Sequence, residues 1–325
     1  MSSIQLSPPD GAVRVVTRHG ALAEILGRDG VVHCSGHDVV TGDWVIVDED
    51  RITEVLERRT VIARRRPGRR SEVQALAANV DVVFIVEALG TPINERRIER
   101  YLTLVWDGGA TPVIVLSKAD RSADLAADIE AAEEAFLGVS VVALSALEDE
   151  DIDALTATIP EGATIALLGP SGVGKSTLLN RLAGDDIAQT TDVRSGDDKG
   201  RHTTTRRTLS VLERYAVIDT PGLREIGLAG GDEGIRLTFD DVDTVAERCR
   251  FGDCTHAEEP GCAVREAVED GTLDVERVGH YRQLLKEQAA EALRQDAAAS
   301  RREGKKMGRM IREAKRWRNQ RRGGD

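Results

Sequence analysis

Apolar and polar positions alternate over short runs in residues 1–66, which is the period-2 pattern of β-strands. Glycine and aspartate, which favour turns, separate these runs. The predicted strands are Val13–Val16, Gly30–Cys34, Asp43–Val47 and Arg51–Val55. Few helical repeats occur, so we predict a small all-β barrel, for which the oligonucleotide-binding (OB) barrel is the common architecture at this size. Such barrels also serve as plain scaffolds, so the pattern alone does not establish nucleic-acid binding.

Between residues 80 and 228, short apolar runs alternate with helical periods. The predicted strands cover 82–86, 112–116, 139–144 and 164–168, and the predicted helices cover 94–106, 121–136, 151–158 and 175–183. Strands that alternate with helices indicate a parallel α/β sheet. Two shorter strands, over 208–212 and 215–218, lead into Asp219-Thr220-Pro221-Gly222.

The pattern changes again after residue 228. A cysteine-histidine cluster at 249–262 precedes a helical pattern rich in Leu and Ala, and a basic tail follows. We therefore predict three domains: an all-β OB barrel over 1–66, an α/β domain over 67–228, and a mainly helical domain with a basic tail over 229–325.

The composition adds limits to this organisation. The chain has 325 residues, of which 41% are hydrophobic, and no apolar run reaches the about 18 residues that a membrane helix needs. The first residues, MSSIQLSPPD, lack the charged-then-apolar pattern of a signal peptide. We therefore expect a cytoplasmic protein, in which four cysteines favour metal ligands or buried thiols over disulfides.

The charge is unevenly distributed. The net charge is −12, yet residues 301–325 sum to +8 and the remainder to −20. An acidic body with a basic tail indicates a polyanionic partner for the tail, and a solubilising end is the alternative. A second basic stretch, Arg64–Arg70, would either contact phosphates or form a solvated linker.

The strand over 164–168 runs into a segment that fits the phosphate-loop pattern G-x-x-x-x-G-K-[ST]. Small residues there let backbone N–H groups face phosphates, and the dipole of the following helix favours the anion. Lys175 would reach the β- and γ-phosphates as a catalytic group, and Ser176 would bind Mg²⁺. A chance glycine-rich turn is the alternative. The predicted nucleotide-binding residues here are Gly169, Pro170, Ser171, Gly172, Val173, Gly174, Lys175, Ser176 and Thr177.

Two further segments suit a γ-phosphate switch. Asp219 at a strand end would hold the Mg²⁺ water, while the N–H of Gly222 would meet the γ-phosphate. In Gly200–Thr205, either Thr204 or Thr205 would complete the Mg²⁺ shell. The preceding residues, 184–200, are rich in Gly and Asp and lack an apolar period, which is typical of a mobile loop. A plain Ser/Thr-rich turn is the alternative.

Ser117-Lys118-Ala119-Asp120 resembles the guanine-reading motif of GTPases. The Asp120 carboxylate can accept both N1–H and N2–H of guanine, which adenine does not offer. Ser145 and Ala146, at the next strand end, resemble the backbone clamp on guanine O6. Both segments would lie at the carboxyl edge of the sheet, where open α/β sheets bind ligands.

The motifs stand in an unusual order, because the guanine motif precedes the phosphate loop. Joining the end of the series to its beginning restores the ordinary order, so the central domain is predicted to be a circularly permuted P-loop GTPase. The segment after Asp219–Gly222 then runs directly into the C-terminal domain, and a shift of this second switch could move that domain.

The whole chain resembles the circularly permuted, ribosome small-subunit-dependent GTPase family. The N-terminal barrel, Gln74–Asp81, Arg100–Leu102, Gly200–Thr205 and the cysteine cluster carry this resemblance. It implies GTP hydrolysis stimulated by the 30S subunit, late 30S maturation, contact with 16S rRNA, and a monomer without membrane contact. A nucleotide-regulated RNA-binding module with incidental hydrolysis is the alternative. An ATP-dependent kinase is a third, which predicts no role for Asp120.

The sequence departs from this family pattern at the guanine motif, where Ser117 replaces the usual Asn. In addition, Leu223 follows Gly222, so the water-orienting glutamine of Ras-like enzymes is absent. The resemblance implies that His202 takes over this catalytic role. A surface histidine is the alternative.

Cys249-x₄-Cys254-x-His256-x₅-Cys262 offers three thiolates and one imidazole. A Cys₃His set is an accepted tetrahedral ligand set for structural zinc. The sequence offers no fifth ligand or general base beside the cluster, which favours a structural site over a catalytic one. Buried free thiols beside a chance histidine are the alternative. Cys34 lies far from the cluster and is predicted to be a core thiol.

Overall fold

The computed structural model describes residues 11–34, 36–65, 73–145, 149–183, 207–219, 232–290 and 292–293. They divide into two compact units. Unit 1 comprises Met1–Arg64 and Val73–Asp240, and unit 2 comprises Arg65–Glu72 and Asp241–Asp325. Among the described residues, no helix is long and apolar enough to cross a membrane.

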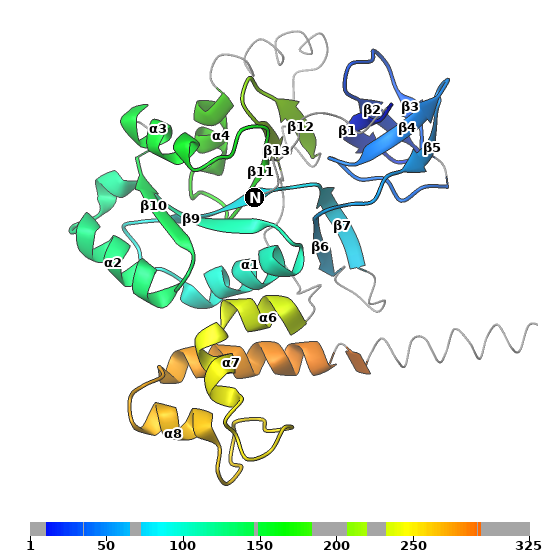
Figure 1. Ribbon diagram of the computed structural model, residues 1–325. Coiled ribbons are helices and arrows are strands. Elements are labelled where there is room, and N and C mark those ends of the chain that lie inside the picture. The colour runs from blue at the N-terminus through cyan, green and yellow to red at the C-terminus, as the bar shows by residue number, and fades with distance from the viewer. Residues whose placement is uncertain are drawn as a thin grey trace, which may run out of the picture. The chain divides into compact units, whose positions relative to one another are not determined.

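The N-terminal part of unit 1 is a closed five-stranded barrel with the order β1-β2-β3-β5-β4. Its strands are β1 Val13–His19, β2 Leu22–Ile25, β3 Val32–His33, β4 Trp44–Asp48 and β5 Arg51–Val55. The β3–β5 pair is parallel and the other pairs are antiparallel. Cys34 lies in the barrel core with the buried valines, as the sequence predicts. The predicted barrel is thereby confirmed (Figure 1).

A six-stranded sheet with the order β10-β9-β8-β11-β13-β12 forms the centre of unit 1. The strands are β8 Val82–Ala88, β9 Thr111–Ser117, β10 Ser140–Leu144, β11 Thr164–Leu168, β12 Thr208–Val211 and β13 Ala216–Asp219. All neighbouring pairs are parallel except β12–β13. The all-buried strand β11 fits a parallel sheet that is covered on both faces.

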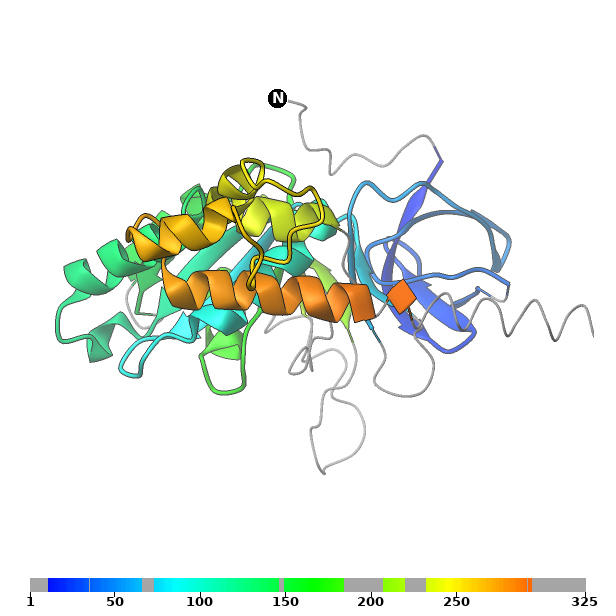
Figure 2. The same ribbon diagram turned by 90° about the horizontal axis from the view of Figure 1, so that it is seen from below.

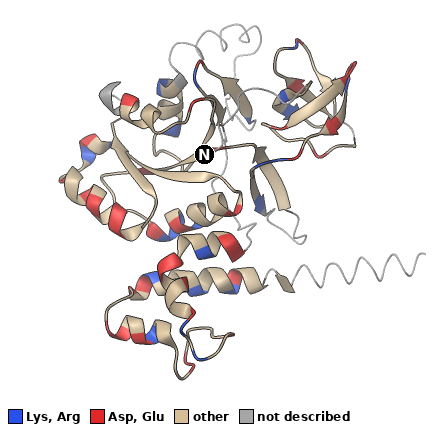
Figure 3. Ribbon diagram, viewed as in Figure 1, with Lys and Arg blue, Asp and Glu red and all other residues tan. Residues whose placement is uncertain are grey.

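Helices cover both faces of this sheet: α1 Glu95–Asp107, α2 Leu125–Ala135, α3 Asp149–Ala157 and α4 Lys175–Ala183. The alternation of side chains along β8 separates the two cores. Val83 and Ile85 pack in the cluster that includes α1 and α2, whereas Phe84 packs in the cluster that includes α3 and α4 (Figure 1). The charged side chains of α2 are all acidic (Figure 3).

A two-stranded sheet of β6 Val61–Arg65 and β7 Val73–Ala78 connects the barrel to β8 in the chain. Buried Arg14 on β1 donates from Nε to the Gly42 carbonyl (3.1 Å) and from Nη2 to the Asn79 carbonyl (3.0 Å). Gly42 is required here, because a Cβ would lie 2.2 Å from the Ala78 oxygen. These bonds join the barrel to the segment that enters the sheet.

The chain leaves the sheet through α6 Asp232–Thr238, which belongs to unit 1 and packs on α1. The Gly234 N–H donates to Asp107 Oδ1 (2.6 Å), and the Thr103 and Thr238 hydroxyl oxygens lie 3.2 Å apart. Gly234 has no room for a side chain, since a Cβ would approach the Thr103 oxygen to 2.2 Å.

Unit 2 contains most of α7 Asp240–Ala246, α8 Ala263–Glu269 and a helix over 275–290, which is orange in Figure 2. Arg277 pairs with Asp241 through two bonds of 2.7 and 2.8 Å, and Tyr281 donates to Asp243 (3.2 Å). These contacts tie the long helix to α7, while Val264, Ala267, Val278 and Leu284 supply buried apolar surface.

Candidate functional site

Strand order brings the separated nucleotide motifs to one edge of the sheet. Because β10, β9, β8, β11 and β13 run parallel, their carboxyl ends all meet there. That edge carries Ser117–Asp120, Ser145, the phosphate loop 169–176 and Asp219. Five predicted site residues lie outside the described part of the chain: Ala146, His202, Thr204, Thr205 and Gly222.

The phosphate loop packs tightly against β8. Gly169 has a φ of +146°, and a Cβ there would lie 2.3 Å from the Val86 oxygen, so only glycine fits. Helix α4 begins at Lys175, whose Nζ donates to the carbonyls of Gly169 (2.8 Å) and Pro170 (2.7 Å). The lysine ammonium therefore sits within the curve of the loop, while the side chains of Ser176 and Thr177 are exposed.

Asp219 ends β13 on the same edge. Burial raises the pKa of its carboxyl, and the positive charge of Lys175 partly offsets that rise. Burial removes water that would stabilise the negative charge of this carboxylate. A bound divalent cation would compensate that charge, so a desolvated carboxylate near the lysine is suited to hold one. Ser176 and Asp219 are the residues here that could hold Mg²⁺.

The guanine motif is attached directly to the phosphate loop. The buried Ser117 hydroxyl lies 2.6 Å from the Val173 carbonyl oxygen and 3.1 Å from that of Glu87. Lys118, with a φ of +59°, donates from Nζ to the Gly172 carbonyl (2.7 Å). Serine in place of asparagine therefore still reaches the loop, and Asp120 is left exposed in the short helix Ala119–Arg121.

Glu87 is not predicted from the sequence, although it helps to form this edge. Its side chain is 4% exposed and pairs with Arg97 of α1, and its carbonyl faces the Ser117 hydroxyl. A single carboxylate at the end of the apolar run Val82–Val86 is the signal that could have indicated it. A buried charge needs a partner, and Arg97 supplies one.

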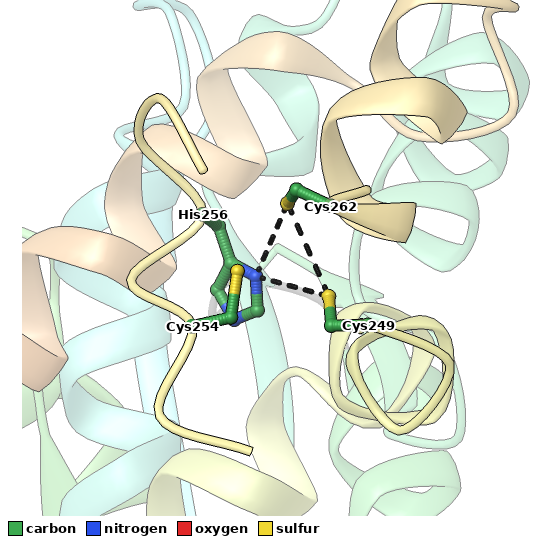
Figure 4. A group of neighbouring side chains, drawn as sticks. All are labelled: Cys249, Cys254, His256 and Cys262. Carbon is green, nitrogen blue, oxygen red and sulfur yellow. Dashed lines mark hydrogen bonds between the residues drawn. The ribbon is translucent and has the colours of Figure 1, made fainter. Parts of the chain in front are cut away.

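Unit 2 brings Cys249, Cys254, His256 and Cys262 together (Figure 4). Their ligand atoms all lie within 4.8 Å of one another. His256 Nδ1 is 3.6 Å from Sγ of both Cys249 and Cys262, and these two sulfurs are 4.0 Å apart. A tetrahedron with Zn–S bonds of about 2.3 Å and a Zn–N bond of about 2.0 Å has edges of about 3.5 and 3.8 Å. The donor set therefore fits a zinc ion.

The electrostatics of this cluster also suit a metal. Burial lowers the pKa of His256, which favours the neutral imidazole that a metal ligand must be. Burial raises the pKa of the Cys249 thiol, but hydrogen bonds from the backbone amides of Val264 and Ala263 in the first turn of α8 and from the neighbouring thiols outweigh it, so the net shift is downward and favours the thiolate.

Glu259 organises the loop that carries two of the four ligands. Its Oε1 accepts from the Thr255 N–H (3.0 Å), and its Oε2 accepts from the N–H groups of Ala257 (2.9 Å) and Glu258 (3.1 Å). These donors flank His256, which has a strained φ of +56°. The carboxylate thus holds the backbone that presents Cys254 and His256.

We expect Glu259→Gln to weaken zinc binding about 10- to 100-fold, the range found when a group that orients metal ligands is lost. The amide keeps the size of the side chain but loses the charge that attracts several N–H groups. Competition with a chromophoric zinc chelator measures the change. Glu258→Gln is the matched control. The Glu258 carboxylate is next in sequence to Glu259, but it is exposed and accepts none of these loop hydrogen bonds. Equal zinc affinities of the two variants would contradict this role.

Comparisons with known proteins agree with this geometry. The RsgA GTPase family model matches residues 55–229. The protein "Small ribosomal subunit biogenesis GTPase RsgA 2" of Listeria monocytogenes is 42% identical over 89% of this chain and 84% of its own length. "Small ribosomal subunit biogenesis GTPase RsgA" of Methanosarcina acetivorans is 41% identical, covering 85% of this chain and 79% of its own.

Two solved structures share the fold. YjeQ from Thermotoga maritima aligns with a TM-score of 0.61 at 26% identity, covering 85% of this chain and 97% of that one. YloQ, described as a circularly permuted GTPase, aligns with a TM-score of 0.61 at 23% identity over 85% of this chain and 94% of that one.

Proposed function

The chain belongs to the RsgA GTPase family, and from that premise we propose that it hydrolyses GTP during biogenesis of the small ribosomal subunit, late in its maturation, and is stimulated by that subunit. The observation that carries the proposal is the strand order β10-β9-β8-β11-β13. It joins a guanine motif to a phosphate loop that follows it in the chain, as a permuted GTPase requires.

Each residue of the edge has a role in this proposal. Lys175 would bind the β- and γ-phosphate oxygens, and Ser176 with Asp219 would hold Mg²⁺. When bound, Mg²⁺ neutralises charge on these oxygens as the terminal phosphate leaves. Asp120 would select guanine, since it is exposed beside the loop and Ser117 and Lys118 fix its segment to Val173 and Gly172. Ser145 and Ala146 would clamp guanine O6.

Water attack needs an orienting group, which we assign to His202. Thr204 or Thr205 would complete the Mg²⁺ shell, and the Gly222 N–H would meet the γ-phosphate. The support for His202 is the family resemblance, which implies a histidine in the first switch, and the local chemistry agrees with it. Leu223 occupies the place of the usual glutamine, whereas an imidazole in the first switch can accept a hydrogen bond from water.

The zinc site would be structural. Four protein ligands close the tetrahedral shell and leave no open position for substrate. RNA contacts would come from the barrel, unit 2 and the basic tail 301–325, because a body with a charge of −20 needs cationic anchors on 16S rRNA. The protein would act in the cytoplasm, as a monomer.

The test is steady-state GTP hydrolysis with and without purified 30S subunits. We expect the subunits to raise turnover, with ATP hydrolysed far more slowly because Asp120 reads guanine. His202→Ala should bind GTP normally but lose about 10²-fold of the stimulated rate, the lower range for an acid–base or orienting group. Turnover that 30S subunits leave unchanged would favour the alternative, an RNA-binding module with incidental hydrolysis.

A further inference from the structure

Within the part of the chain that the structure describes, two arginines of unit 1 have no anionic partner. Arg64 lies in β6, and Arg207 directly precedes β12. Nε of each is buried and has no hydrogen-bond partner, and within the described ranges neither arginine forms an ion pair with a carboxylate. The two charges are also close enough to interact: burial and then the charge of Arg64 lower the pKa of Arg207.

Other arginines of the same unit behave differently. Arg58 pairs with Asp43 at 2.7 Å, Arg59 pairs with Asp81 at 3.2 Å, and Arg97 pairs with Glu87. Even Arg14, which is buried, donates to two carbonyls. Unit 1 therefore normally compensates guanidinium groups that lose water, as the cost of an unpaired buried charge requires. Arg64 and Arg207 both depart from this rule, and the charge of one acts on the other.

The backbone holds the pair in place. The Thr41 hydroxyl donates to the Arg207 carbonyl (3.3 Å), and the Thr41 carbonyl accepts from the Ala78 N–H (3.0 Å). Because Ala78 ends β7, which pairs with β6, one set of contacts fixes the segments that carry both arginines. The fold thus fixes two segments whose like charges interact, and no carboxylate among the described residues pairs with either arginine.

We infer that Arg64 and Arg207 form a phosphate-binding pair that takes a phosphodiester of RNA. Guanidinium groups bind phosphate oxygens through paired N–H bonds, and one phosphate between them would neutralise both charges. RNA is favoured as the source because the chain around the pair is basic in sequence, with Arg65 and Arg66 after Arg64 and Arg206 before Arg207. The inference rests on the proposed function, since it assumes an RNA-containing partner.

This placement has a consequence for regulation. Arg207 follows the predicted first switch, Gly200–Thr205, with one residue between them. A phosphate bound there would hold the chain where that switch rejoins the sheet. RNA binding at Arg207 and GTP hydrolysis at the first switch would then act on the same stretch of chain. This connection is a physical route for stimulation by the subunit.

The test compares Arg64→Gln, Arg207→Gln and the double variant in the full chain. We expect each substitution to weaken binding to purified 30S subunits about 5- to 10-fold and to lower the slope of log affinity against log salt by about one, as loss of one phosphate contact does. The double variant should lose less 30S affinity than the product of the two single fold-losses, because both arginines hold the same phosphate. Thermal unfolding of the free variants should occur at a higher temperature, since the repulsion is removed.

Arg214→Gln is the matched control, because it removes an exposed charge from the turn between β12 and β13. Unchanged 30S affinity and salt slope in the double variant would overturn the inference, and so would a lower unfolding temperature with equal affinity. Titration of inorganic phosphate into the wild type tests the other possible ligand, which is free phosphate instead of an RNA phosphodiester. Phosphate binding that the double variant loses while it keeps full 30S affinity would also overturn the RNA assignment. If the wild type itself fails to bind 30S subunits, the proposed function fails as well.

Discussion

Lys175→Ala should reduce GTP hydrolysis on the order of 10²–10³-fold, with and without 30S subunits, as removal of a fixed charge from a developing anion does. The Lys175 ammonium lies within 2.8 Å of two carbonyls of the phosphate loop, so it is positioned before nucleotide arrives. Its loss also removes the positive charge that counters the burial of Asp219, so the pKa of Asp219 should rise further. Mg²⁺ binding should weaken for the same reason.

The measurement is single-turnover hydrolysis at saturating GTP and Mg²⁺, which separates chemistry from binding. Lys286→Ala serves as the control, because it removes an exposed lysine from the helix over 275–290 in unit 2. Full activity of Lys175→Ala at saturating nucleotide would contradict both the role of the lysine and the GTPase mechanism proposed for this edge.

The sequence predicts the strands and helix at this edge well because their signals are local. A phosphate loop must follow a strand and begin a helix, and residues 164–183 satisfy both conditions. The same holds for the guanine motif at the end of β9. Helices α1 to α4 also agree with their predicted ranges within a few residues.

Elements that depend on distant contacts are not predicted. Strand β7 reads Val-Gln-Ala-Leu-Ala-Ala, which favours a helix by propensity, and β6 ends in arginines that resemble a linker. Both form strands because they pair with each other and place Ile62 and Leu76 in the core of the sheet. Strand β2, over Leu22–Ile25, is also missing from the prediction.

Single polar residues are harder still. Arg14 reads as an exposed position of an alternating strand, yet it is buried over Trp44 and bonds to Gly42 and Asn79. Nothing in its local sequence indicates these acceptors, the farther of which is 65 residues away. Glu259 is likewise an ordinary surface carboxylate by composition. Only the folded loop shows that its oxygens meet the amides beside His256.

The second large effect is expected from the metal site. Purified protein should contain about one Zn²⁺ per chain, because four ligands close one tetrahedral shell. Cys254→Ser should release it and expose residues 249–262 to proteolysis, since binding of about 10–16 kcal/mol in comparable small zinc modules stands in for a hydrophobic core. Desolvation and then the neighbouring thiols raise the pKa of Cys254 to about 11, so zinc must displace its proton and affinity should fall as pH falls.

Elemental analysis after dialysis without chelator, followed by limited proteolysis, checks both effects. Cys34→Ala is the matched control: this thiol is 1% exposed in the barrel core, its one hydrogen bond is a weak contact to the Gly20 carbonyl at 3.8 Å, and its loss should leave zinc content unchanged. GTP hydrolysis without 30S subunits should survive in Cys254→Ser, because the described residues of the nucleotide edge all belong to unit 1. Stimulation by 30S subunits should be lost if unit 2 carries RNA contacts. Wild-type protein without zinc, or a Cys254→Ser variant that retains it, would show that the four side chains form a thiol cluster instead of a metal site.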